Sequence, residues 1–261
     1  MRSVSIVTCT YNSSETLIDT LSSIKHILSD KKFIEFELII VDSSEDNSVQ
    51  KAIQDFDYKV RYYHVSAEGI YKAMNFGARV SKNDYVWFLN SDDYLADAGM
   101  PLKLLSLKMD LDLPIIFGRV CWIDAVSKKI KAMSSFNPLI KIHHLACYPP
   151  HPATMVRRDI FMSCNGFDEK LRISADFDLF LKIVKYCRIE VSETYFESKF
   201  LVIMRTGGAS SKGPVSQVIK LYEDYLSIRK NGLSLILIIL KRLTKGWFFY
   251  ASKRLLKKSK L

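Results

Sequence analysis

"SVSIVTCTYNSSETL", residues 3–17, joins a run of β-branched residues to a polar turn and the start of an amphipathic pattern. Residues 3–10 form a short apolar run without polar alternation, which predicts a buried strand. In the turn, Asn12 and Glu15 have the spacing of a helix N-cap and its capping-box partner. Leucine and isoleucine then recur at helical spacing through residues 17–28, so the stretch predicts a strand, a turn and a helix.

The same alternation continues toward the middle of the chain. Further strands are predicted at residues 36–42, 60–65 and 84–89, with helices at 43–56 and 69–80 between them. This order is typical of an α/β fold in which helices cover a mostly parallel sheet. Beyond it we expect a hairpin at residues 114–134, a loop with a helix at 151–169 and a further helix at 174–186. A strand that enters a glycine and serine loop follows at 200–213, and a last helix at 214–230 begins at Pro214.

Size and composition fit one large globular domain, or one domain with an appended module. Of the 261 residues, 48% are hydrophobic and 12% aromatic, which excludes a disordered chain. The five cysteines are scattered without a C-x-x-C pair, so we expect reduced thiols in a cytosolic protein. The apolar run at the N-terminus is too short for a signal-peptide core and is predicted to be the first strand.

Positive charge is concentrated at the C-terminus. The formal net charge is +10, and residues 225–261 contain ten Lys or Arg and no Asp or Glu, which leaves 28 basic and 28 acidic residues in the rest of the chain. The apolar run 235–240 is far shorter than the roughly 20 residues that span a bilayer. On a helical wheel, Lys241, Arg242 and Lys245 lie opposite an apolar face, as in helices that lie in an anionic membrane interface.

The alternative for this tail is a C-terminal helix that packs on the body of the protein with solvated lysines. Nucleic-acid binding is disfavoured, because the charge is separated from the rest of the chain and no recognisable nucleic-acid module accompanies it.

Polar clusters follow three of the predicted strands: Thr10-Tyr11-Asn12, Asp42-Ser43-Ser44 and Asn90-Ser91-Asp92-Asp93. In parallel α/β sheets, ligands bind beyond the carboxyl ends of the strands, so we expect the clusters to converge on one crevice. There Asp42 would accept hydrogen bonds from a base or a ribose, and the Tyr11 ring would be available for stacking. Alternatively, Asp42 is a turn residue held by local backbone bonds.

Two adjacent carboxylates at the end of a buried strand repel each other. Asp92 and Asp93 are hard oxygen ligands, and a divalent cation between them and a diphosphate would relieve this repulsion. Mg²⁺ or Mn²⁺ suits one or two carboxylates combined with phosphate oxygens. The alternative is that the two acids cap a helix that follows them.

Asp176 and Asp178 lie two residues apart in a predicted helix, so they do not share a face and are expected to have different roles. Asp176 is at the helix start, where the dipole stabilises the anion that a general base must be. The alternative is an acid that only stabilises the helix. His151 lies in a loop stiffened by flanking prolines and is a candidate site residue.

Several segments together resemble the family 2 glycosyltransferases of bacterial polysaccharide synthesis, most closely the colanic-acid and capsule type. They are VSIVTCTYNSSETLIDTLSSI, FELIIVDSSEDNS, GIYKAMNFGARVSKNDYVWFLNSDDYL, GFDEKL and SADFDLFLKI, in the family's order over about residues 1–210. The resemblance implies a GT-A fold over residues 1–212, with a nucleotide-binding half to about residue 95 and an acceptor-binding half at 96–212. Residues 213–261 would form amphipathic, basic C-terminal helices.

The resemblance also implies site residues. Those matching the family's nucleotide-sugar contacts are Thr10, Tyr11, Asn12, Asp42, Lys72, Asn75 and Asp92. Asp92 and Asp93 match the metal-binding acids, Asp176 matches the catalytic base, and His151 matches a histidine on the acceptor side. This chain departs from the family's usual pattern at Asn90-Ser91-Asp92, at Asp42-Ser43-Ser44 and at Ala175 before Asp176, which leaves open which acid ligates the metal and which base is bound.

The implied reaction is metal-dependent transfer, with inversion, of a sugar from a UDP- or GDP-sugar to a hydroxyl of a lipid-linked glycan. We expect a peripheral protein on the inner face of a bacterial plasma membrane. The alternative is a non-catalytic GT-A-like module that binds a nucleotide-sugar or a glycan, against which the retained acids argue. A sugar-1-phosphate nucleotidyltransferase or a dehydrogenase is disfavoured, because no glycine-rich phosphate loop follows the first strand.

Overall fold

The computed structural model describes residues 2–30, 32–96, 102–134, 148–186, 194–207 and 213–234. Its N-terminal part alternates strands and helices as predicted: β1 (Arg2–Thr10), α1 (Ser14–Ser29), β2 (Ile34–Asp42), α2 (Ser48–Gln54), β3 (Val60–His64), α3 (Ile70–Val80) and β4 (Tyr85–Phe88). The later elements are β5 (Tyr94–Leu95), α4 (Leu102–Asp110), β6 (Ile115–Ile123), β7 (Ile130–Met133), a 3₁₀ turn η2 (His151–Ala153), β8 (Thr154–Arg157), α5 (Arg158–Ser163), α6 (Ala175–Tyr186), β9 (Thr194–Arg205) and α7 (Pro214–Lys230).

The strands form one sheet in the order β3-β2-β1-β4-β8-β6-β9-β5, with β7 paired to β6. The first four are parallel, so their carboxyl ends lie along one edge. Strand β8 is antiparallel to both neighbours, and β6 and β9 are parallel to each other. The predicted α/β class with a largely parallel sheet is confirmed.

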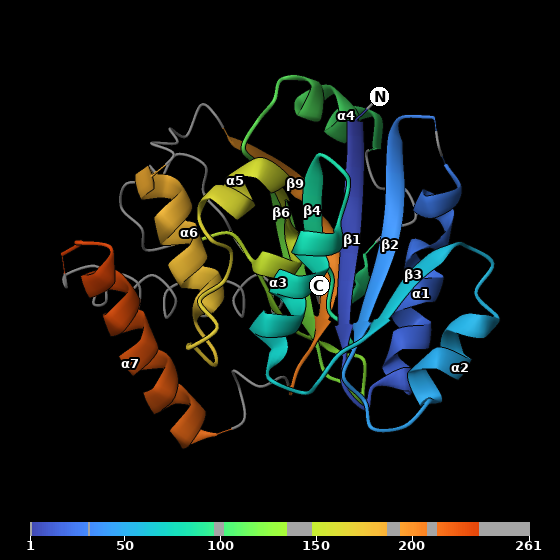
Figure 1. Ribbon diagram of the computed structural model, residues 1–261, viewed down its shortest axis with the longest axis horizontal. Coiled ribbons are helices and arrows are strands. Elements are labelled where there is room, and N and C mark those ends of the chain that lie inside the picture. Colours follow the sequence, from blue (N-terminus) through green and yellow to red (C-terminus); the bar gives the residue numbers. More distant parts are fainter. Residues whose placement is uncertain are drawn as a thin grey trace, which may run out of the picture.

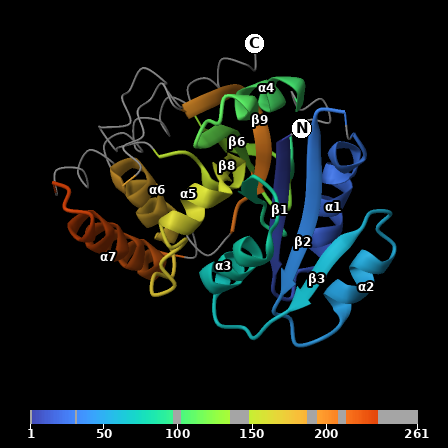
Figure 2. The same cartoon turned by 45° about the horizontal axis from the view of Figure 1, so that its top comes forward.

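Helices cover both faces of this sheet (Figures 1 and 2). On one face, α1, α2 and α4 pack on alternate strand residues such as Val4, Ile6 and Trp87. On the other, α3, α5 and α6 pack on the intervening residues, among them Val7 and Phe88. Burial from both sides explains why β1 and β2 are continuous apolar runs instead of alternating ones.

Helix α3 lies unusually close to β1. A Cβ atom placed on Gly77 would be 2.3 Å from a methyl carbon of Val7, so only glycine allows this approach. Because α3 follows the carboxyl end of β3, which is parallel to β2, its first turn lies at the same edge as the carboxyl ends of β1 and β2.

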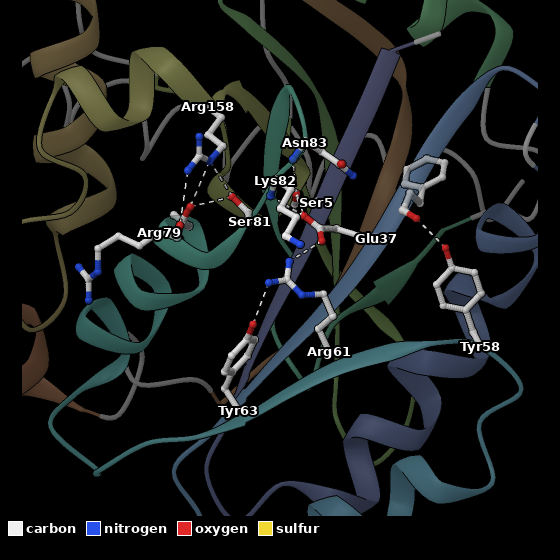
Figure 3. A network of polar contacts seen from close by, with 12 residues as sticks. Ser5, Glu37, Tyr58, Arg61, Tyr63, Arg79, Ser81, Lys82, Asn83 and Arg158 are labelled. Atoms are coloured by element: carbon white, nitrogen blue, oxygen red, sulfur yellow. Dashed lines mark hydrogen bonds and ion pairs between the residues drawn. The ribbon is translucent and has the colours of Figure 1, made fainter.

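A polar network holds the opposite, amino-terminal half of the sheet together (Figure 3). The Glu37 carboxylate accepts hydrogen bonds from Ser5 Oγ, from the Lys82 backbone N–H and from Arg61. Beside it, the Arg158 guanidinium donates to carbonyl groups in the last turn of α3, where a cation complements the helix dipole. This network fixes the α3–β4 connection at a distance from the carboxyl edge.

Two local predictions were wrong, and one alternative is excluded. The capping box does not form: the N-cap of α1 is Ser13, and Asn12 adopts a left-handed φ of 51°. Residues 151–169 contain the strand β8, which was missed because four residues give no readable pattern. The acids at 92 and 93 do not cap a following helix, since β5 comes next.

The predicted hairpin at residues 114–134 is confirmed as β6 and β7, and the last predicted helix does begin at Pro214. No helix among the described residues is long and apolar enough to cross a membrane. The predicted interfacial helix falls on residues 235–261 and lies outside the described residues.

Candidate active site

The carboxyl ends of β1 and β2 meet around one buried carboxylate. Asp42 is fully buried, and its Oδ1 accepts hydrogen bonds from Thr10 Oγ1 at 2.7 Å and from the N–H and hydroxyl of Ser44. Its Oδ2 accepts the Tyr62 hydroxyl at 2.8 Å. Burial opposes ionisation, but these donors together lower the pKa of Asp42 below its ordinary value, so the carboxylate stays charged.

These contacts refine the predicted role of Asp42. Because protein groups surround the carboxylate, a base or ribose reaches it directly only if the Tyr62 hydroxyl turns aside from Oδ2. In the structure as it stands, Asp42 fixes the neighbouring segments: Ser43 N–H also bonds the Thr10 carbonyl, and Asn12 N–H bonds Ser44 Oγ.

Of the other residues predicted to contact the donor, Tyr11 is free to bind a ligand, whereas Lys72 is already engaged in an ion pair. Tyr11 is 55% exposed beside Asp42, as a stacking platform requires. Lys72 is exposed in the first turn of α3, where its Nζ pairs with Glu68 at 2.5 Å. A donor phosphate at Lys72 would therefore compete with Glu68 for the same ammonium group.

Asn75 has a structural role in this geometry. Its side chain is buried, its amide nitrogen donates to the Phe167 carbonyl and to Glu169, and its oxygen accepts the Phe167 N–H. These bonds attach α3 to the segment before α6. All polar atoms of the side chain are engaged, so the predicted contact with the donor diphosphate would require breaking them.

The adjacent acids Asp92 and Asp93, called here the acid pair, follow β4 at the same edge. Asp93 is 1% exposed and accepts a hydrogen bond from Asn90 Nδ2 at 2.9 Å, whereas Asp92 is half-buried. Burial, followed by repulsion from Asp92, raises the pKa of Asp93 well above its ordinary value, and burial also raises the pKa of Asp92. Both charges are therefore held in an unfavourable environment.

Residues that the sequence reading did not single out support the acid pair. Arg205, at the end of β9, lies close enough to lower the pKa of both acids, although burial outweighs it, and it also pairs with Asp19. Thr20 Oγ1 donates to the Asp93 carbonyl at 2.6 Å, and the hydroxyls of Ser13 and Ser91 are 2.8 Å apart. These contacts join α1 and β9 to the acid pair. No local sequence motif predicts them, because the contacting residues are distant in the chain.

The acid pair fits a divalent cation by its chemistry. The charge of Arg205 does not offset the burial of the two carboxylates, whose pKa values stay raised, and the buried Asn90 Oδ1 has no hydrogen-bond partner among the described residues. Asp92, the more accessible acid, would be the principal ligand. No group of three or more His, Cys, Asp or Glu side chains with metal-site geometry occurs among the described residues, so phosphate oxygens would have to complete the coordination.

Asp176 lies in the first turn of α6 within a group of aromatic side chains from separate segments. The buried Tyr148 hydroxyl hydrogen-bonds Asp176, and burial followed by the charges of Asp176 and Asp224 raises the pKa of Tyr148. His151 is half-buried with its Nε2 atom buried, and it is near enough for Asp176 to act on its pKa, which burial nonetheless lowers, favouring a neutral imidazole. On α3, burial followed by the charge of Asp176 raises the pKa of Tyr71. We call Asp176, Tyr148, His151 and Tyr71 the base cluster.

Asp178 has a different environment, as predicted. It is completely buried, its Oδ2 is 2.9 Å from Lys182 Nζ, and Asn231 donates to its other oxygen. Asp178 therefore holds α6 and the end of α7 together, whereas Asp176 is half-buried at the helix start.

Strand β4 connects the base cluster to the acid pair. The Phe88 ring, at the end of β4, stacks on the His151 ring with centroids 5.9 Å apart, and Asn90 follows two residues later. Trp87 Nε1 donates to the Pro152 carbonyl at 2.7 Å and fixes the turn that presents His151. The structure thus brings Thr10 and Asp42 together directly, and places the acid pair and the base cluster next to the end of β4.

Solved structures with this architecture are glycosyltransferases of the GT-A type. The chain superimposes on Staphylococcus aureus TarS, residues 1–349, with a TM-score of 0.64 at 16% identity over 92% of this chain and 70% of that one. It is also similar to the mannosyltransferase PcManGT from Pyrobaculum calidifontis, solved with GDP-Man and Mn²⁺, with a TM-score of 0.61 at 13% identity over 87% of this chain and 63% of that one. At these identities the likeness shows the GT-A fold alone.

The family follows from the sequence match. The model of glycosyl transferase family 2 matches residues 5–162, and the chain belongs to this family. An uncharacterized glycosyltransferase of Rickettsia typhi is 22% identical over 84% of this chain and 69% of its own length. S. aureus TarP, a poly(ribitol-phosphate) β-N-acetylglucosaminyltransferase, is 31% identical over 38% of this chain and 31% of its own length. Against two other Rickettsia glycosyltransferases, the chain spans only 29% and 33% of the relative.

Proposed function

We propose that this protein is an inverting glycosyltransferase that moves a sugar from a nucleotide-diphosphate-sugar to a hydroxyl group of a glycan acceptor. The observation that supports this most is the arrangement around the end of β4: an acid pair suited to a cation on a diphosphate follows the strand, and a half-buried helix-start carboxylate lies near His151, whose ring stacks on Phe88 of the same strand. A displacement reaction needs these two kinds of group on opposite sides of the anomeric carbon.

Asp176 acts as general base in this mechanism. Its carboxylate takes the proton of the acceptor hydroxyl, whose oxygen forms the new bond to the anomeric carbon as the bond to the phosphate oxygen breaks. The Tyr148 hydroxyl orients the carboxylate through its hydrogen bond. Asp92 and Asp93 would hold the divalent cation, Mn²⁺ or Mg²⁺, which would stabilise negative charge on the leaving diphosphate.

The donor class is a UDP- or GDP-sugar, with the base stacked on Tyr11 near Asp42. In support, TarS has been solved with UDP-GlcNAc and with UDP, and PcManGT with GDP-Man. We assign the acceptor to a lipid-linked saccharide of bacterial surface polysaccharide, of the capsule or exopolysaccharide type. The relation to TarP, whose name describes transfer to a poly(ribitol-phosphate), is consistent with a surface-polymer acceptor.

Release of nucleoside diphosphate from a panel of UDP- and GDP-sugars tests the proposed function. One nucleotide class should be hydrolysed slowly in the presence of Mn²⁺ or Mg²⁺, because water can replace the acceptor, and chelation with EDTA should stop the reaction. If a donor binds but no donor turns over with or without glycan acceptors, the protein is a non-catalytic binding module instead.

We also propose that residues 232–261 attach the protein peripherally to the anionic inner face of the plasma membrane. Each basic residue near an anionic leaflet contributes on the order of 1 kcal/mol, so removing this segment should abolish binding to phosphatidylserine or phosphatidylglycerol vesicles. Cosedimentation of the full chain, the truncated chain and a variant with Lys241, Arg242 and Lys245 changed to Glu would measure this. Equal binding by all three would overturn the proposal.

A further inference from the structure

The segment that leads into α6, residues 172–174, is held by a carboxylate from the last described helix. Glu223 on α7 is 5% exposed and accepts three backbone hydrogen bonds: from Arg172 at 2.7 Å and from Ile173 and Ser174 at 2.8 Å each. Helix α7 packs beside α6 in both views (Figures 1 and 2). One side chain therefore satisfies three N–H groups immediately before the turn that contains Asp176.

The same segment is held from its other side by α3. The Tyr71 hydroxyl donates to the Ile173 carbonyl at 2.7 Å, and the backbone N–H groups of Ala175 and Asp176 lie near enough to act on the pKa of Tyr71. From α7, Lys220 Nζ adds a contact to Ser174 Oγ at 3.1 Å. Residues 172–176 are thus fixed between two helices that are separated by more than 130 residues in the sequence.

Position matters more for a general base than for a residue that only packs. A displacement of about 1 Å from the productive geometry can lower a catalytic rate by about 100-fold. Glu223 touches neither the predicted donor residues nor the acid pair, and its described bonds all go to residues 172–174. Its loss should therefore affect the proton-transfer step and leave donor binding unchanged.

We propose that Glu223 is a positioning residue for the reaction, one that sets the location of the Asp176 carboxylate through residues 172–174. This inference rests on the proposed function of Asp176. Helix α7 lies beyond the family match at residues 5–162 and beyond the predicted domain boundary at residue 212. The proposal gives this helix a role in the reaction on the acceptor side.

Steady-state kinetics of Glu223→Gln test this proposal. Glutamine has one acceptor oxygen where glutamate has two, so at least one of the three N–H groups loses its partner. We expect kcat to fall by about 10- to 100-fold while KM for the nucleotide-sugar stays within about twofold. Glu223→Asp, which keeps both oxygens on a shorter side chain, should give an intermediate kcat.

Glu37→Gln is the matched control. Glu37 likewise accepts a backbone N–H, from Lys82, and two side-chain donors, but it lies five residues before Asp42 on β2, about 17 Å from the carboxyl edge. The Glu37→Gln substitution should lower the melting temperature without lowering kcat. All variants are assayed below their own melting transitions.

Two results would overturn the proposal: a folded Glu223→Gln variant with kcat within about twofold of the parent, or equal losses of kcat in Glu223→Gln and Glu37→Gln. Should Glu223→Gln not fold, Glu223→Asp decides on the same criterion. Failure of the underlying function is recognised separately, because then Asp176→Asn would also leave kcat unchanged.

Discussion

Replacing Asp176 by Asn should lower kcat by at least about 100-fold without weakening donor binding, because a positioned general base contributes about 10²–10⁴-fold. Asparagine has nearly the same shape but cannot take the proton. Its oxygen can still accept the hydrogen bond that Tyr148 makes to Asp176, so the base cluster should keep its structure. Single-turnover rates and calorimetric titration with the donor measure the two quantities independently.

Asp178→Asn provides the contrast within the same helix turn. Asp178 is buried against Lys182, and breaking a buried pair by removing one partner costs about 3–5 kcal/mol. Urea denaturation should therefore show a large loss of stability for Asp178→Asn and little change for Asp176→Asn. If Asp176→Asn turns over as fast as the parent, or if the two variants lose kcat equally, Asp176 is not the base.

Sequence patterns predicted the parallel half of the sheet because their signals are local. Apolar runs such as residues 3–10 and 36–42 need only their own composition to identify them, and burial on both faces removes ambiguity about alternation. Strand β8 was missed because its partners, β4 and β6, are distant in sequence and its four residues contain no period. The strand conformation of β8 is therefore determined by pairing with distant segments and not by its own sequence.

The same distinction applies to the site. The acids at 42, 92, 93 and 176 are visible as charges at the ends of predicted elements. The residues around these acids are not visible in the sequence, because they belong to other segments of the chain. They are Tyr62, which contacts Asp42, Arg205, which lies near the acid pair, and Tyr148, which contacts Asp176. Asn75 is a further example: its position in the motif predicts a donor contact, and the sequence does not show its buried bonds to residues 167–169, which give it a structural role.

Replacing Asp92 by Ala should abolish the metal dependence of donor binding. Asp92 is the more accessible acid, and removing a direct ligand should cost more than the about 10–100-fold loss of metal affinity that follows from replacing a supporting residue. Calorimetric titration of the donor with Mn²⁺, with Mg²⁺ and with EDTA measures the difference. Metal-dependent affinity equal to that of the parent would rule out Asp92 as a ligand.

The raised pKa values of the acid pair give this prediction a pH dependence. A cation binds the ionised carboxylates, and groups with raised pKa values become protonated at a higher pH than ordinary carboxyls do. As the pH falls, protons should therefore displace the cation from the parent protein earlier than from a site of ordinary acids. The Asp92→Ala variant should lack this pH-dependent loss.

Without metal, the same substitution should stabilise the protein. An acid whose pKa is raised by folding is more favourably ionised in the unfolded chain, so at neutral pH it lowers the free energy of unfolding. Asp92 has a raised pKa itself and adds to the raised pKa of Asp93, and its removal relieves both effects. We therefore expect Asp92→Ala to melt at a higher temperature than the metal-free parent while losing the gain in melting temperature that Mn²⁺ and donor give the parent. A lower melting temperature without metal would mean that the acid pair serves the fold and not a cation.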